Sequence, residues 1–191
     1  PLVVIDHFLQ EKYDWILRSR RRLQTNAAIL PKQYLTGERH FFLGDPYTLI
    51  IHENAKQGSV VVDGVFMHCH IKVAASQSDK QALVHHWYRQ QINLLLPSLI
   101  KKWELIIGVQ VKSWGVKAMK TRWGSCNPLK RHIWINLHLV QKPLLCLEYV
   151  VVHELVHLLE ASHNARFYAL MSQFMPNWAC YQAQLKGEIN N

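Results

Sequence analysis

The feature that most constrains this chain is an apolar stretch, residues 143–159, that carries His153, Glu154 and His157. It opens with Pro143, which suits a first helical turn, and continues mainly with leucine and valine. A helix that is apolar on nearly every side must be buried. Each buried polar group without a partner costs about 1–3 kcal/mol, so the three polar side chains need a shared partner. The stretch therefore predicts a buried helix that holds a ligand.

The spacing of these residues indicates what that ligand is. His153 and His157 are four residues apart, which places both imidazoles on the same side of a helix, within reach of one metal ion. Glu154 projects beside them and is suited to hold a water as a general base, as in zinc hydrolases. The alternative is a chance grouping of buried histidines around a glutamate. The cost of burying them unpaired disfavours it.

A third ligand must come from outside this helix. His163 is the nearest candidate, and it requires the chain to leave the helix near Ala161, with Ser162 capping a second helix. Glu160 is the competing candidate, since carboxylates also bind zinc. We predict zinc bound by His153, His157 and His163, with Glu160 outside the ligand set.

Composition bounds the rest of the chain. With 191 residues, 49% of them hydrophobic, the simplest organisation is one globular domain over residues 1–191. We see no apolar run of the length that spans a membrane. The four cysteines are widely spaced without a Cys-x-x-Cys pair, which disfavours a cysteine-only zinc site and favours a cytoplasmic location.

The formal net charge of +9 raises the question of nucleic-acid binding. The basic residues are scattered, apart from the run Arg18, Arg20, Arg21 and Arg22. Charge alone supports only non-specific attraction. We therefore expect at most weak, non-specific nucleic-acid binding. The oligomeric state does not follow from the sequence.

The pattern of elements predicts an α+β fold. A helix is expected over Ile5–Leu23, then an antiparallel sheet of three or four strands, with Asp63-Gly64 as a hairpin turn. Ser78–Gln81 is typical of a capping box that opens a long helix, which Pro97 should break or restart. Further elements are expected at these places: strands within 109–119 and 132–137, and helices over 143–159, 163–175 and from Pro176 to about Lys186.

Several blocks of the chain resemble the YgjP-like metallopeptidases, small zincin-type proteins related to the SprT-like peptidases. The blocks are Lys120–Cys126 (Lys-Thr-Arg-Trp-Gly-Ser-Cys), Ile133–Leu137, Tyr149–Leu158 with its His-Glu-x-x-His, and His163–Tyr168. The resemblance implies a zincin-like helical half, a zinc ion on His153, His157 and His163, and Glu154 as the catalytic base. It also implies a peptide or protein substrate. The His157–His163 spacing is shared with the metzincins, but their glycine is replaced here by Glu160, which disfavours that assignment.

Two classes of function follow. The first is a zinc metallopeptidase, in which Glu154 takes a proton from the attacking water and returns it to the leaving amine. Its oxyanion donor is open among Arg122, Tyr149 and Arg166, with Cys146 on the same helical sector as Tyr149. The second is a zinc-containing binding module associated with nucleic acid or with DNA-bound protein. The intact Glu154 favours the enzyme, because a purely structural zinc site does not need that carboxylate.

Overall fold

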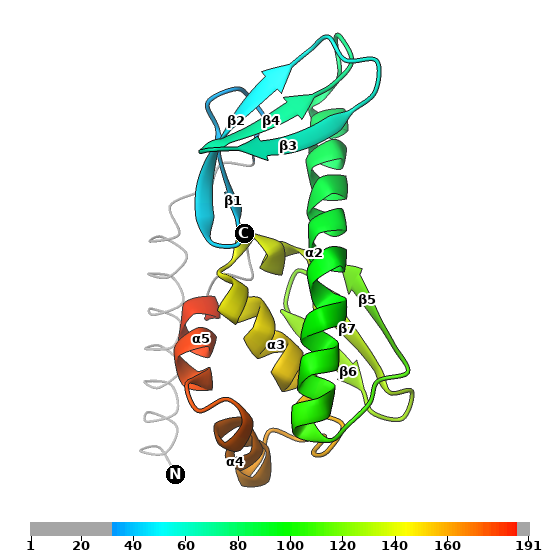
Figure 1. The fold of residues 1–191 in the computed structure, drawn as a ribbon, viewed down its shortest axis with the longest axis vertical. Coiled ribbons are helices and arrows are strands. Elements are labelled where there is room, and N and C mark those ends of the chain that lie inside the picture. Colours follow the sequence, from blue (N-terminus) through cyan, green and yellow to red (C-terminus); the bar gives the residue numbers. More distant parts are fainter. Residues whose placement is uncertain (1–31, 187–191) are drawn as a thin grey trace, which may run out of the picture. The chain divides into compact units, whose positions relative to one another are not determined.

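The structure is a computed structural model that describes residues 32–186. Within that part it is a mixed α+β fold, as predicted, with two small sheets and most helices in the second half (Figure 1). The predicted helix over Ile5–Leu23 and the arginine run beside it lie outside the described residues. The elements are β1 Arg39–Phe42, β2 Asp45–His52, β3 Ser59–Asp63, β4 Phe66–His70, α2 Gln77–Ile107, β5 Ser113–Lys117, β6 Gly124–Asn127, β7 His132–Asn136, the 3₁₀ helix η1 Leu137–Gln141, α3 Leu144–Val156, α4 Ala165–Phe174 and α5 Trp178–Leu185.

The first sheet has four strands in the order β1-β2-β4-β3, and it differs from the prediction in one pairing. The hairpin at Asp63-Gly64 is confirmed, and it joins β3 to β4 in antiparallel register. Strands β2 and β4, however, run parallel. Residues 53–58 carry the chain past one strand position, so that β3 returns at the edge and β4 fills the gap beside β2. The prediction of a purely antiparallel sheet was therefore wrong. The order of the strands depends on the connection formed by residues 53–58, which the strand sequences do not specify.

Helix α2 is a single continuous helix of 31 residues, although Pro97 lies inside it. Its capping box is formed by Ser76 and Asp79, two residues earlier than the predicted start. The predicted break at Pro97 was wrong. Pro97 and Asn93, whose carbonyl loses its helical partner, are both exposed, so solvent can take the place of the missing N–H.

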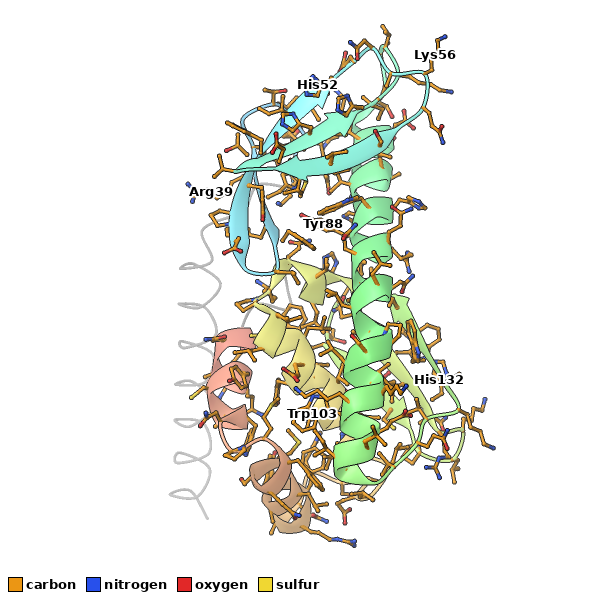
Figure 2. All side chains as sticks on the ribbon, viewed as in Figure 1. Arg39, His52, Lys56, Tyr88, Trp103 and His132 are labelled. Atoms are coloured by element: carbon orange, nitrogen blue, oxygen red, sulfur yellow. The ribbon has the colours of Figure 1, made fainter. Side chains whose placement is uncertain are left out.

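Helix α2 contacts both the four-stranded sheet and the later elements η1, α3 and β5 (Figure 1). Tyr88 donates its hydroxyl to the Phe41 carbonyl of β1 at 2.8 Å, and Trp103 donates its indole N–H to Glu148 of α3, also at 2.8 Å. Figure 2 shows both side chains projecting from α2 on the side of those partners. These bonds satisfy polar atoms inside the core, so α2 holds β1 and α3 in place.

The second sheet has three strands in the order β5-β7-β6, with β5 and β7 parallel. The strand β6 was not predicted, because its sequence Gly-Ser-Cys-Asn has little strand propensity. It pairs in antiparallel register with β7, whose Ile133 and Ile135 are buried. Both β6 and β7 pack on α3, so this sheet lies directly against the His-Glu-x-x-His helix.

Helix α3 is buried along most of its length, as its composition predicted. Pro143 is its N-cap, and the Leu43-Gly44 turn between β1 and β2 rests on that proline. Both turn residues have positive φ, 52° and 94°, the geometry of a two-residue hairpin turn. A Cβ on Gly44 would lie 2.9 Å from Pro143 Cγ, so glycine is needed for this close approach. No helix among residues 32–186 is long and apolar enough to cross a membrane.

Candidate metal centre

The last turn of α3 presents the two histidines of the predicted site. His153 lies within the helix, and His157 is its C-cap, with φ −62° and ψ −15°. Both side chains are half-buried, and their ring centroids are 5.0 Å apart. The four-residue spacing thus places the two imidazoles together, as helical periodicity requires.

Immediately after α3 the chain turns, and this turn orients His157. The Nδ1 of His157 donates to the carbonyl oxygen of Glu160 at 3.1 Å. A carbonyl oxygen only accepts, so Nδ1 carries the proton and Nε2 keeps its lone pair. A backbone carbonyl on the distal ring nitrogen is the usual support of a metal-binding histidine.

His163 reaches the same place from the start of the next helix. Asn164, rather than the predicted Ser162, caps α4, accepting from the Phe167 N–H at 3.0 Å. The Nε2 atoms of His163 and His153 are 2.9 Å apart. One nitrogen from each of His153, His157 and His163 lies within 4.8 Å of the others. The structure therefore brings together the three predicted ligands from the end of α3 and the loop before α4.

The Phe167 ring packs against all three imidazoles. Its ring centroid is 4.9 Å from that of His153 and 4.7 Å from those of His157 and His163, and its side chain is fully buried. Phe167 is in the first turn of α4, which packs against the preceding helix α3. Phe167 thus limits the positions that the rings can take.

The electrostatics of the trio suit a metal ion. Burial, followed by the neighbouring His157 and His163, lowers the pKa of His153 to about 3. Burial also lowers the pKa of His157 below its usual value. Both rings are therefore neutral at neutral pH and offer lone pairs, the form in which imidazole binds metals.

Glu154 follows His153 in α3 and is not part of the histidine group. It is 4% exposed and faces β6, where Gly124 leaves room for its side chain. Burial raises its pKa to about 8, against the opposing effect of Arg122. Its Oε2 has no hydrogen-bond partner within the described part of the chain. A buried carboxyl with an open acceptor is costly unless a cation or a bound water compensates it.

These residues fit a zinc ion. Three neutral imidazole nitrogens are a frequent ligand set of catalytic zinc, and they leave a further position for water or substrate. The unpaired Oε2 of Glu154 is an acceptor for such a water. His153, His157 and His163 would hold the ion.

The other predicted residues occupy different places. Glu160 accepts from the Ser162 N–H at 3.2 Å and lies 3.7 Å from Arg166, so its carboxylate has other partners and is outside the histidine group, although its charge acts on His157. Cys146 donates to Gln184 and packs against α5. Tyr149 contacts His153 edge-on, with ring centroids 5.8 Å apart. Arg122 is exposed and acts on Glu154 through its charge.

Sequence reasoning missed two contributors to the site. The Glu160 carbonyl orients His157, and a backbone group leaves no signal in residue identity. Gly124 lies against Glu154. The only indication of this contact in the sequence is a glycine within a short polar segment. Tyr168 also stacks between His163 and Trp178, at 6.3 and 5.3 Å.

Three converging histidines, a buried glutamate one residue after the first of them, and a sheet packed against their helix define a site of the metallopeptidase class. The family model described as "YgjP-like, metallopeptidase domain" matches residues 1–188. The chain belongs to the YgjP-like metallopeptidase family, and its class of activity is peptide hydrolysis.

Two solved structures are similar to parts of the chain. The metallopeptidase zymogen abylysin of Pyrococcus abyssi is 15% identical with a TM-score of 0.44, covering 48% of this chain and 92% of its own. The zymogen jannalysin of Methanocaldococcus jannaschii is 19% identical with a TM-score of 0.40, covering 47% and 90%. No curated protein matches the chain.

Proposed function

We propose that this protein is a zinc-dependent peptidase in which His153, His157 and His163 hold the ion and Glu154 is the general base. The observation that carries the proposal is the histidine trio, with nitrogens within 4.8 Å, beside a buried carboxyl whose Oε2 is unpaired. The family membership supports a metal and a peptide or protein substrate. When bound, a zinc ion supplies Lewis-acid chemistry, which polarises the scissile carbonyl and lowers the pKa of water.

Glu154 carries the proton in this proposal. Its Oε2 accepts a proton from the attacking water and afterwards returns it to the leaving amine. Burial raises its pKa in the metal-free protein, and a cation held by the histidines would lower it again, so that the ionised carboxylate can accept the proton. Its burial keeps bulk water from competing for the same oxygen.

Stabilisation of the oxyanion requires a donor, and Tyr149 has the position for it. Its ring contacts His153, and its pKa is raised to about 12 by burial against the opposing effect of a hydrogen bond with Gln182, so its hydroxyl is a neutral donor that would have to leave Gln182 to reach the oxyanion. Arg166 lies near Glu160 instead, and Arg122 acts on Glu154. Tyr149 is the donor that we favour.

The strand β6 offers a surface for the substrate main chain. Within the described residues it pairs with β7 alone, so its other edge has free N–H and C=O groups. Gly124, the first residue of β6, touches Glu154. An extended peptide that adds to this edge would therefore pass close to the proposed base.

A cytoplasmic location is part of the proposal. Cys69, Cys126, Cys146 and Cys180 form no disulfide within the described residues. Unlinked thiols are typical of a reducing compartment.

The test is the variant Glu154→Gln. Its zinc content, measured by mass spectrometry of the metal, should equal that of wild type, because Glu154 is not a ligand. Cleavage of a mixture of unfolded polypeptides, followed as new termini by mass spectrometry, should fall by several orders of magnitude. Glu160→Gln is the matched control and should keep its activity. Undiminished cleavage by Glu154→Gln would exclude it as the base.

A further inference from the structure

A second group of three histidines lies on the four-stranded sheet, remote in sequence from the metal centre. His52 is on β2, and His68 and His70 are on β4. His52 and His70 are direct partners in the parallel β2–β4 pair, and His68 is two residues before His70. Because side chains alternate across a strand, all three project from one face. His52 is labelled in Figure 2.

This face is the outer one. The alternate residues Leu49, Met67 and Cys69 are buried in the core, whereas the three histidines are only half-buried. Their neighbours on the outer face of β3 and β4, Val61 and Phe66, are exposed. The imidazoles are thus accessible to a solute while their backbones are held by two central strands.

The rings are in close mutual contact. His52 Nε2 and His68 Nδ1 are 2.9 Å apart. The His70 ring stacks on His52, with centroids 4.5 Å apart and planes 13° apart. His70 nitrogens therefore do not converge with the other pair in this rotamer, and the ring must turn before it can join them.

The separation of the two nitrogens has two explanations. They share a hydrogen bond, or both bind one cation. Two nitrogens at zinc-binding distance, with ligand angles between square and tetrahedral, are about 2.9–3.4 Å apart. The observed 2.9 Å lies at the edge of that range, so one ion can bridge β2 and β4 with little movement of either side chain.

The side chains around this pair suit a transition-metal ion. The nearest carboxylate in sequence, Glu53, is paired with Lys80 at 2.6 Å. The ligand set consists of imidazole nitrogens, which suit zinc, copper and nickel and do not suit calcium or magnesium.

We propose that His52 and His68 form a second site for a divalent transition-metal ion, which His70 completes by rotating its ring. An ion bound there links the parallel strands β2 and β4. It would stabilise this sheet independently of the catalytic ion, since the two histidine groups lie on different elements. The proposal does not depend on peptidase activity.

The experiment measures metal stoichiometry on the full chain by equilibrium dialysis against micromolar Zn²⁺, repeated with Ni²⁺. Wild type should bind two ions per chain. The variant His52→Phe keeps an aromatic ring stacked against His70 but removes the nitrogen ligand. It should bind one ion per chain. His68→Ala should do the same, and His70→Ala should weaken the second ion by about tenfold or more.

Two controls separate this site from other causes. His86→Ala removes an exposed histidine on α2 and should still bind two ions. His153→Ala should lose the other ion and keep the one at His52, so failure of the proposed catalytic centre is distinguishable from failure of this site. The rise in melting temperature on adding Ni²⁺ should be smaller in His52→Phe than in His86→Ala. A stoichiometry in His52→Phe equal to that of wild type, whatever the wild-type value, overturns the proposal.

Discussion

Replacing Gly124 with alanine should reduce peptidase activity without removing the metal. A Cβ at this position would lie 2.8 Å from Glu154 Cγ and 2.8 Å from Val150 Cγ1, and it would meet Glu154 Oε1 more closely still. Ordinary contact begins at 3.4 Å, so the Glu154 side chain must move by at least 0.6 Å. Val150 is a buried helix residue and cannot give way easily.

The size of the effect follows from that displacement. A misplacement of about 1 Å can cost about a hundredfold in rate, so kcat should fall between about tenfold and a hundredfold. Overpacking should also lower the free energy of unfolding by about 1–3 kcal/mol. The zinc content should remain that of wild type, because the histidines are not displaced directly.

A matched control is available in the same sheet. Gly115 is also in close contact, since its Cβ would lie 2.9 Å from Trp134 Cε3, but on the face remote from Glu154. Gly115→Ala should show a comparable loss of stability and an unchanged kcat. The assay is cleavage of unfolded polypeptides, with melting temperature and zinc content measured in parallel. If Gly124→Ala kept wild-type kcat, or if both variants lost activity equally, the proposed role of the Gly124–Glu154 contact would be refuted.

Three further outcomes are expected. His163→Ala should lose zinc affinity far more than Glu160→Ala, measured by competition with a chelator; the reverse order would make this a two-histidine, one-glutamate site. In metal-free protein, the pKa of Glu154 is raised from 4.5 to about 8, so the folded state holds a proton that the unfolded state releases and stability falls as pH rises through this window. Glu154→Gln should remove that fall, which chemical denaturation at pH 4 and pH 8 would reveal, and equal pH slopes in both proteins would contradict it. Binding to DNA should be weak and decrease steeply with salt in a filter assay, and sequence-selective binding near physiological salt would instead favour a nucleic-acid module.

The part of the site that local sequence determined is the His153–His157 pair with Glu154. Its geometry depends only on helical periodicity, and the apolar residues around it ensured that the helix would be buried. The position of His163 was also foreseeable, because a new helix after a short turn brings it back. Its cap was not: Asn164 rather than Ser162 takes that role, and the two residues have similar preference for it.

Other features depended on contacts between distant residues. Pro97 was expected to break α2, yet the exposure of Asn93 and Pro97 makes the lost bond tolerable, and exposure is a property of the folded molecule. The parallel pairing of β2 and β4 depended on where the chain placed β3, which the strand sequences do not encode. The prediction of one domain over residues 1–191 stays a prediction.

Tertiary structure alone decided which polar groups meet. Gly124 and Glu154 are thirty positions apart in sequence, and they meet because β6 pairs with β7 and packs against α3. His52 and His68 likewise meet through strand register, since a shift of one residue would turn either side chain into the core. Sequence determined the chemistry that each residue offers and the pairs that one helix holds together. The fold determined the remaining pairs, because contacts across elements depend on register and packing that no local pattern specifies.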